Sequence, residues 1–189
     1  MVKVTYSEKL VNIPADVTVN VDGKSVTVTG VKGTVKKDFS ETPFKYELVN
    51  NSLKISKNNA NKKELAMMGT IASHIKNMFA GVTKGYTYKM KIVYSHFPIS
   101  VKLLSADKLQ IENYGGERLP RIAKILNGVQ VRVEGDDLII AGIDKEAVSQ
   151  TAANIQQTCR TKDKDPRVFM DGIYVYQKLV GEDVFWKLI

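Results

Sequence analysis

The chain has 189 residues, of which 43% are hydrophobic and 25% are charged. This is the composition of an ordinary globular protein, and no apolar run approaches the roughly 18 residues needed to span a bilayer. The N-terminus lacks the apolar core of a secretory signal, so we expect an intracellular protein. A single cysteine excludes an internal disulfide, and with only two histidines no structural metal site is expected. The formal charge of +8 favours a polyanionic partner, with nucleic acid as the leading candidate.

The N-terminal half begins with a predicted β-hairpin. Residues 17–21 and 25–29 each alternate between apolar and polar side chains. Between them stands Asp22-Gly23, a pair that suits a two-residue turn because both residues tolerate positive φ. The returning strand leads into a basic, glycine-bearing stretch at residues 32–37.

A short predicted strand at residues 52–56 is followed by a change of period. Apolar side chains recur at three- and four-residue spacing through residues 61–81, which indicates an amphipathic helix lying on a sheet. Asn61 is placed as the N-cap and Glu64 as its reciprocal partner. Gly81 is placed near the expected end of the helix.

Residues 86–93 alternate again and predict a half-buried strand. Its apolar face carries Tyr86, Tyr88, Met90 and Ile92. Its other face carries Thr87, Lys89 and Lys91, so we expect the outward side of this strand to be cationic.

The C-terminal half repeats the order of the first. Residues 99–103 and 108–112 predict a second hairpin, and residues 137–141 predict a second short strand. A helix is expected to begin at Asp144, a good N-cap. Its apolar stripe consists of Val148, Ala152, Ile155 and Cys159, so the cysteine is most simply a small buried residue.

Corresponding positions of the two halves lie roughly 82 to 85 residues apart, which favours two domains. We therefore predict an α+β protein of two tandem duplicated domains, each a small, mainly antiparallel sheet covered by one helix. The predicted boundaries are 1–96 for the N-terminal domain and 97–189 for the C-terminal domain, with a basic segment in the tail of the latter.

Charge is divided unevenly between these halves. Residues 1–96 contain fifteen lysines, no arginine and seven acidic residues, whereas residues 97–189 contain eight lysines, five arginines and thirteen acidic residues. Net charge thus favours the first half as the polyanion-binding half. Arginine favours the second, because its planar guanidinium binds phosphate bidentately. The two measures disagree, and composition leaves the binding half open.

No residue set predicts catalysis. His74 falls within the first predicted helix, and neither it nor His96 has a partner that would make it a general base. Cys159 lacks a nucleophile signature, and the loops at 30–33 and 81–85 lack the spacing of a phosphate-binding loop. The residues therefore indicate a protein that binds rather than one that catalyses, with no cofactor and no small-molecule substrate.

The basic segments have different expectations. Lys62, Lys63 and Lys76 are most simply solvated, whereas the group Lys84, Lys89 and Lys91 is left open between solvation and binding. The tail indicates RNA contact, because cations recur through an irregular segment beside a glycine and an aromatic ring. Its candidate residues are Arg160, Lys162, Lys164, Arg167, Gly172, Tyr174 and Lys178. A second set, beside Gly115-Gly116, is Arg118, Arg121 and Lys124. Phe169, flanked by apolar residues, is expected in the core.

Two long motifs then connect the chain to a known family. The first runs through residues 63–99 and contains Gly81-Val82-Thr83-Lys84-Gly85-Tyr86-Thr87-Tyr88-Lys89-Met90-Lys91. The second is Lys162-x-Lys164-Asp165-x-Arg167-x-Phe169-x-Asp171-Gly172-Ile173-Tyr174-Val175. Together they closely resemble the universal large-subunit ribosomal protein six family, called protein nine in eukaryotes. The resemblance covers the chain from Ile13-Pro14 onward.

The resemblance implies a two-domain, non-catalytic protein that binds large-subunit ribosomal RNA. In this family the C-terminal domain lies near the sarcin-ricin loop and the factor-binding centre, which implies neighbouring ribosomal proteins and nearby translational GTPases as partners. It implies a location in cytoplasmic ribosomes, with assembly in the nucleolus if the source is eukaryotic. It also favours the arginine-bearing half as the RNA-binding half.

Two other functions stay open from the residues alone. A protein-interaction adaptor would use its basic faces to meet acidic partners, with the lysine-rich strand 86–93 mediating association. An RNA-modifying enzyme would need a catalytic set, and no such set is evident.

Overall fold

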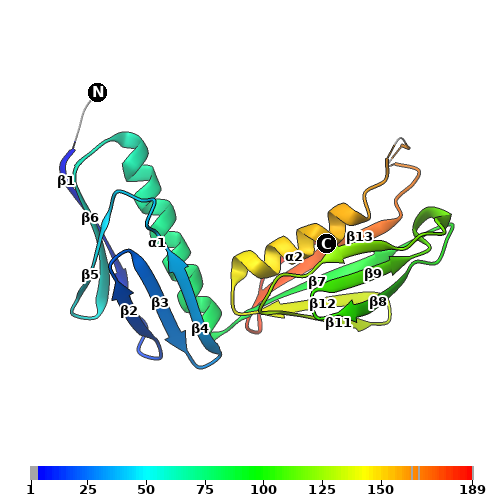
Figure 1. Ribbon diagram of the computed structural model, residues 1–189, viewed down its shortest axis with the longest axis horizontal. Coiled ribbons are helices and arrows are strands. Elements are labelled where there is room, and N and C mark those ends of the chain that lie inside the picture. The colour runs from blue at the N-terminus through cyan, green and yellow to red at the C-terminus, as the bar shows by residue number, and fades with distance from the viewer. Residues whose placement is uncertain (1–3, 163, 166, 189) are drawn as a thin grey trace. The chain divides into compact units, whose positions relative to one another are not determined.

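The computed structural model describes residues 4–162, 164–165 and 167–188, and the chain divides into two compact units, Met1–Lys84 and Gly85–Ile189 (Figure 1). The division lies before strand β7 (Tyr86–Val93), whereas we expected the first domain to extend to residue 96. The difference has a physical reason: β7 pairs with strands of the second unit on both of its edges. From the sequence we had assigned this strand to the first domain because it directly follows the helix of that domain.

Unit 1 contains two three-stranded sheets and one helix. The first sheet has the order β1-β6-β5 and consists of β1 (Val4–Asn12), β5 (Lys45–Val49) and β6 (Ser52–Ala60). The second has the order β2-β3-β4 and consists of β2 (Thr18–Asp22), β3 (Ser25–Gly30) and β4 (Gly33–Asp38). Helix α1 (Lys62–Thr83) contacts strands of both sheets.

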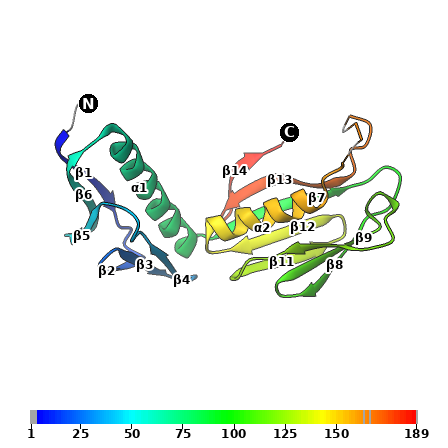
Figure 2. The same cartoon turned by 45° about the horizontal axis from the view of Figure 1, so that its top comes forward.

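Unit 2 has the same parts with an addition. Its smaller sheet, of order β10-β9-β8, consists of β8 (Ser100–Ser105), β9 (Lys108–Glu112) and β10 (Arg121–Lys124), with a 3-10 turn η1 (Tyr114–Gly116) between β9 and β10. Its larger sheet, of order β11-β12-β7-β13-β14, adds to β7 the strands β11 (Val129–Glu134), β12 (Asp137–Gly142), β13 (Gly172–Val180) and β14 (Asp183–Lys187). Helix α2 (Lys145–Thr158) lies across it (Figure 2).

The two units share one topology, which confirms the predicted duplicated α+β fold. The order β1-β6-β5 of unit 1 reappears as β7-β12-β11 in unit 2, and every strand pair described is antiparallel. Each unit has two sheets, not the single sheet expected. In unit 2 the tail adds β13 and β14 to the edge of β7 that the first copy leaves without a strand in the described residues.

Helix α1 begins as the sequence predicted. Asn61 Oδ1 accepts a hydrogen bond from the Glu64 amide at 3.0 Å, and Glu64 Oε2 accepts one from the Asn61 amide at 2.8 Å. This reciprocal capping box satisfies two of the amides that a helix start leaves without partners. The helix ends at Thr83, so Gly81 lies in its last turn, near the end as expected. Gly81 is buried in the helix and does not cap it.

The first hairpin confirms the prediction with a shift of one residue. Asp22 pairs with Ser25, so the two turn residues are Gly23 and Lys24. Gly23 has φ +61°, a left-handed conformation that glycine adopts without strain. Asp22 thus ends the strand instead of occupying the turn.

The helix-facing residues form the cores as the patterns indicated. In β7 the four apolar side chains predicted to share one face are all at most 6% exposed. In α2 the stripe from Val148 to Cys159 is likewise buried, and Asp144 caps the helix by accepting a hydrogen bond from the Glu146 amide at 2.9 Å. The spacing of apolar residues was sufficient to predict which side chains of α2 are buried, because a helix buries the residues that share one face.

Replacing Asn61 with Ala should destabilise unit 1 by about 1 kcal/mol, since the substitution removes the N-cap acceptor. Two measurements check this: the urea midpoint of unfolding of the whole chain, and amide hydrogen exchange in α1, which reports the stability of unit 1 locally. Lys63→Ala, an exposed change in the same helical turn, serves as the control. An equal loss of stability in both variants would show that the capping box contributes nothing specific.

Candidate nucleic-acid interface

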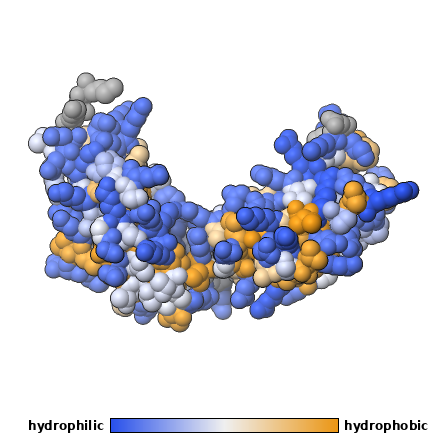
Figure 3. All heavy atoms as spheres, viewed as in Figure 1, coloured by the Kyte–Doolittle hydropathy of each residue, from blue (hydrophilic) through white to orange (hydrophobic). Residues whose placement is uncertain are grey.

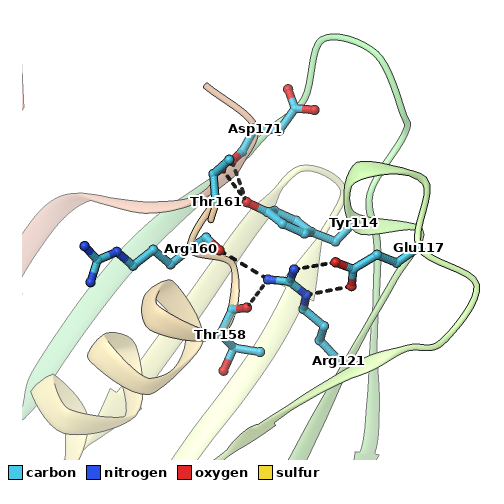
Figure 4. Close-up of polar contacts among 7 residues, drawn as sticks. All are labelled: Tyr114, Glu117, Arg121, Thr158, Arg160, Thr161 and Asp171. Carbon is cyan, nitrogen blue, oxygen red and sulfur yellow. Dashed lines mark hydrogen bonds and ion pairs between the residues drawn. The ribbon is translucent and has the colours of Figure 1, made fainter. Parts of the chain in front are cut away.

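The tail that leaves α2 is held by Arg121, at the start of β10. Arg121 forms a two-pronged ion pair with Glu117, with Nη2 2.5 Å from Oε1 and Nε 2.8 Å from Oε2. On its other side, Nη1 donates to the carbonyl oxygens of Thr158 at 2.7 Å and Arg160 at 3.4 Å (Figure 4). The guanidinium therefore joins the η1–β10 loop to the last residue of α2 and to the start of the tail.

Tyr114 supports the same junction through its ring and its hydroxyl. The ring lies 4.2 Å from the Arg121 guanidinium carbon, a cation–π distance, and the side chain is 5% exposed. Its hydroxyl lies 2.9 Å from the Thr161 hydroxyl and donates to the Asp171 carbonyl oxygen at 3.2 Å. A single buried side chain thus ties the two ends of the tail segment 161–171 to each other (Figure 4).

The start of β13 is fixed by buried groups. The Asp171 carboxylate points away from Tyr114 and accepts a hydrogen bond from the Ser95 amide at 2.8 Å (Figure 4). Gly172 is buried, and a Cβ added there would meet the Tyr174 ring at 2.8 Å. Glycine at this position makes room for the ring of Tyr174. Tyr174 itself is 41% exposed.

On this scaffold the cations Lys162 and Lys164 stand at the surface beside a small pocket of about 190 Å³. Lys164 Nζ lies 4.7 Å from the centroid of the Phe169 ring, and that ring lies 5.9 Å from the ring of His96. The prediction that Phe169 is a core residue was wrong. It is half-buried and lines the pocket together with Lys162 and Lys164.

The glycine pair brings a third cation to this end of unit 2. Gly115 and Gly116 have φ of +58° and +79°, so the chain turns sharply after Tyr114. A Cβ on Gly116 would meet the exposed Phe97 ring at 3.2 Å. Arg118 follows in the loop, exposed, and its side chain makes no hydrogen bond or ion pair with the residues that the structure describes.

Arg160 and Arg167 differ in how far they are engaged. The Arg160 side chain points away from the Arg121 cluster (Figure 4). Arg167 is 88% exposed at its side chain and forms a bidentate contact with Asp165, at 3.1 and 3.0 Å. Hydrogen bonds from Arg167 hold the pKa of the Asp165 carboxyl below its usual value. Both arginines face solvent, but the Arg167 guanidinium is already paired with the Asp165 carboxylate.

The structure does not bring the remaining two candidates to this cluster. Lys124 ends β10, and since side chains alternate along a strand, it points to the face opposite Arg121. Lys178 lies further along β13, with Nζ 5.4 Å from the Tyr88 ring and 4.8 Å from the Trp186 ring. It lines a separate groove of about 370 Å³ beside α2.

Local electrostatics agree with an anion-binding surface. The hydrogen bonds from Arg121 lower the pKa of the Glu117 carboxyl, and the nearby charges of Lys162 and Lys164 lower it further.

The two units differ in charge composition. With the division after Lys84, unit 1 holds thirteen lysines and seven acidic residues, and unit 2 holds ten lysines, five arginines and thirteen acidic residues. Hydrophilic residues cover most of the visible surface of each unit (Figure 3).

The sequence did not reveal the part of Tyr114, Thr161 and Asp171 in this site. Tyr114 had one usable signal, an aromatic ring directly before a glycine pair. Thr161 and Asp171 had none, because their roles consist of hydrogen bonds to a residue far away in the chain.

The described residues offer little chemistry beyond binding. They contain no group of three or more metal-ligating side chains, and neither helix is long and apolar enough to cross a membrane. Cys159 is 3% exposed, and burial raises the pKa of its thiol to about 12. At neutral pH this thiol is protonated and therefore a poor nucleophile.

The chain is similar in sequence to ribosomal proteins. The family model described as "Ribosomal protein L6" matches the chain twice, over residues 13–85 and 97–172. The chain is 48% identical to the large ribosomal subunit protein uL6 of Ignicoccus hospitalis, over 95% of this chain and 99% of that protein. It is 48% identical to uL6 of Aeropyrum pernix, over 95% and 99%, and 44% identical to uL6 of Methanospirillum hungatei, over 90% and 97%.

Arg121→Ala should destabilise unit 2 by about 1.5 to 3 kcal/mol, because it removes charge-assisted hydrogen bonds to Glu117 and to the Thr158 carbonyl oxygen. Amide hydrogen exchange of residues 159–171 should rise in the same variant. Arg118→Ala, in the same loop, should leave both readouts unchanged. Equal behaviour of the two variants would remove Arg121 as the anchor of the tail.

Native Cys159 should react with iodoacetamide at pH 8.5 on the order of 1,000-fold more slowly than the same thiol in urea, since the thiolate is the reactive form. The sign follows from burial, which favours the neutral thiol in the folded state. Mass spectrometry of the alkylated protein measures both rates. Rapid native alkylation would contradict the buried position of this residue.

Proposed function

The chain belongs to the ribosomal protein L6 family, and on this premise we propose that it is a structural component of the large ribosomal subunit that binds large-subunit rRNA. Members of this family are structural and not enzymatic. Its partners are then rRNA and neighbouring ribosomal proteins, in cytoplasmic ribosomes, with assembly in the nucleolus if the source is a eukaryote. Translational GTPases act nearby if unit 2 lies beside the sarcin-ricin loop and the factor-binding centre, as the motifs imply.

One observation carries the proposal: exposed cations gather at one end of unit 2 on loops that are anchored internally. Lys162 and Lys164 come from the tail, and Arg118 comes from the loop before β10. Because Arg121 and Tyr114 hold these loops together, the cations are presented at little additional entropic cost on binding.

The candidate residues then divide by role. Lys162, Lys164, Arg118, Arg160 and Arg167 are the proposed phosphate contacts, because phosphate contacts position a protein on RNA and require exposed cations. Tyr174, which is partly exposed, supplies a ring for stacking on a base or sugar.

Arg121 has a different role from the one expected, since it positions the tail from within. Gly172 likewise acts by making room for Tyr174. Lys124 and Lys178 lie apart from the cluster and are proposed as separate, peripheral contacts.

Replacing Lys164 and Arg167 with Ala should weaken binding to a large-subunit rRNA transcript. The plot of log affinity against log salt should become shallower by about 0.7 to 0.9 for each phosphate that the variant no longer neutralises. Lys76→Ala, an exposed change on α1, serves as the control. An unchanged salt slope would remove the two residues from the interface.

The location is tested by sedimentation of a gentle cell lysate on a sucrose gradient, followed by a high-salt wash of the fractions. Co-migration with large subunits through the wash is the expected result. Migration as a free chain near the top of the gradient would contradict a ribosomal role and favour an adaptor that acts elsewhere.

A further inference from the structure

A straight row of residues crosses all five strands of the larger sheet in unit 2. Antiparallel pairing places Arg132 opposite Ile139, Ile139 opposite Lys89, Lys89 opposite Gln177, and Gln177 opposite Lys187. Since residues directly opposite one another in a sheet share a face, the five side chains point the same way. We call this set the cationic row.

The cationic row lies on the sheet face opposite α2. The neighbours Tyr88 and Trp186, which alternate with Lys89 and Lys187 along their strands, line the groove beside α2. The row therefore points away from the helix. Arg132 and Lys187 are exposed, and Lys89 is half-buried.

The cations of the row have no ion-pair partner among the described residues. Arg132, Lys89 and Lys187 form no ion pair or side-chain hydrogen bond there. Lys91, in the next row of the same face, contrasts with them, because its Nζ lies 3.3 Å from Asp137 Oδ1. Within the described ranges, the row thus places three cations without ion-pair partners on one face of the sheet, and the carboxylates nearest to it on that face, Glu134 and Asp137, lie in the adjacent row.

The spacing of the row suits an extended polyanion. Its cations occupy alternate strands, so they are about 10 Å apart and span about 20 Å in all. Within the row itself, the residues between these cations are an isoleucine and a glutamine, neither of which has a ring that could stack on a base. The expected contact is therefore with phosphate groups and not with bases.

The row is separate from the cluster at the tail. Gly172, at the tail end of β13, pairs with Val93, whereas the row crosses β7 at Lys89. Four residues of extended strand separate these two levels, a distance of about 13 Å. The cations of the tail cluster and those of the row therefore lie at different levels of the sheet, and Tyr174, which pairs with Lys91, lies between them.

We propose that the cationic row is a second RNA-binding surface, which contacts the phosphate backbone of an rRNA segment other than the one held by the tail. This inference rests on the proposed function, since it assigns a further contact with the same kind of partner. It also gives a role to Lys89, which the sequence left open between solvation and binding.

The test compares three variants of the full chain on a large-subunit rRNA transcript, by filter binding over a range of salt and by hydroxyl-radical footprinting. The row variant carries Lys89→Gln, Arg132→Gln and Lys187→Gln. The tail variant carries Lys164→Ala and Arg167→Ala. The control carries Lys62→Gln, Lys63→Gln and Lys76→Gln, which remove the same charge from exposed positions on α1.

The row variant should lower the salt slope by about 0.7 to 0.9 for each phosphate left without its cation, and this decrease should exceed that of the control. In footprinting, the row variant should expose one protected RNA segment, and the tail variant should expose a different one. If the row variant matches the control in slope and footprint while the tail variant weakens binding, the second surface is refuted and the proposed function stands. If neither variant alters binding, both fail. If the row variant binds the transcript normally yet washes off large subunits in salt, the face meets a protein, and the RNA assignment is overturned.

The three row cations make no ion pair or side-chain hydrogen bond among the described residues, so the row variant should keep the thermal unfolding midpoint of the original chain. A lowered midpoint would require single substitutions before the binding data are compared. In that case Arg132→Gln, on the exposed edge strand β11, carries the test, and an unchanged salt slope for this variant would overturn the proposal.

Discussion

The candidate interface depends on one ion pair, between Arg121 and Glu117. The planar guanidinium has donors on several edges, so Arg121 can bind a carboxylate bidentately and still donate to two backbone carbonyl oxygens. Lysine could not replace it, since its ammonium lacks this fork. Stacking on the buried Tyr114 ring fixes the plane of the guanidinium. Without this junction, the tail and the glycine loop would be two independent surface segments, and their cations would have no common position.

Among the described residues, the tail that follows α2 distinguishes unit 2 from unit 1. Both units contain the same order of strands and one covering helix. In unit 1 the chain passes from α1 to the second unit, whereas in unit 2 it continues from α2 through the tail into β13 and β14. After α2 the chain returns to pair with β7 as strand β13. Arg121 binds the end of α2 at Thr158, and Tyr114 binds the start of β13 at Asp171. The added strands also widen the sheet on which the cationic row lies.

Net charge and the proposed location of the binding groups point to different units. Unit 1 carries the larger excess of lysine, yet several of its lysines make internal contacts: Lys24 donates to two backbone carbonyl oxygens, and Lys54 and Lys57 pair with glutamates. Unit 2 is closer to neutral, but its cations are gathered on loops or aligned in register. Local presentation, not total charge, distinguishes a surface that binds phosphate from one that is simply solvated.

The sequence alone determined the duplicated α+β organisation, the caps at Asn61 and Asp144, the buried position of Cys159 and, through its motifs, the family. These features depend on periodicity and on residues a few positions apart. The domain boundary, the anchoring roles of Tyr114 and Arg121, the position of Phe169 and the separation of Lys124 and Lys178 from the cluster were decided only by the tertiary structure. Each depends on which strands pair, in which register, and on hydrogen bonds between residues tens of positions apart, and local sequence patterns do not encode such distant pairings.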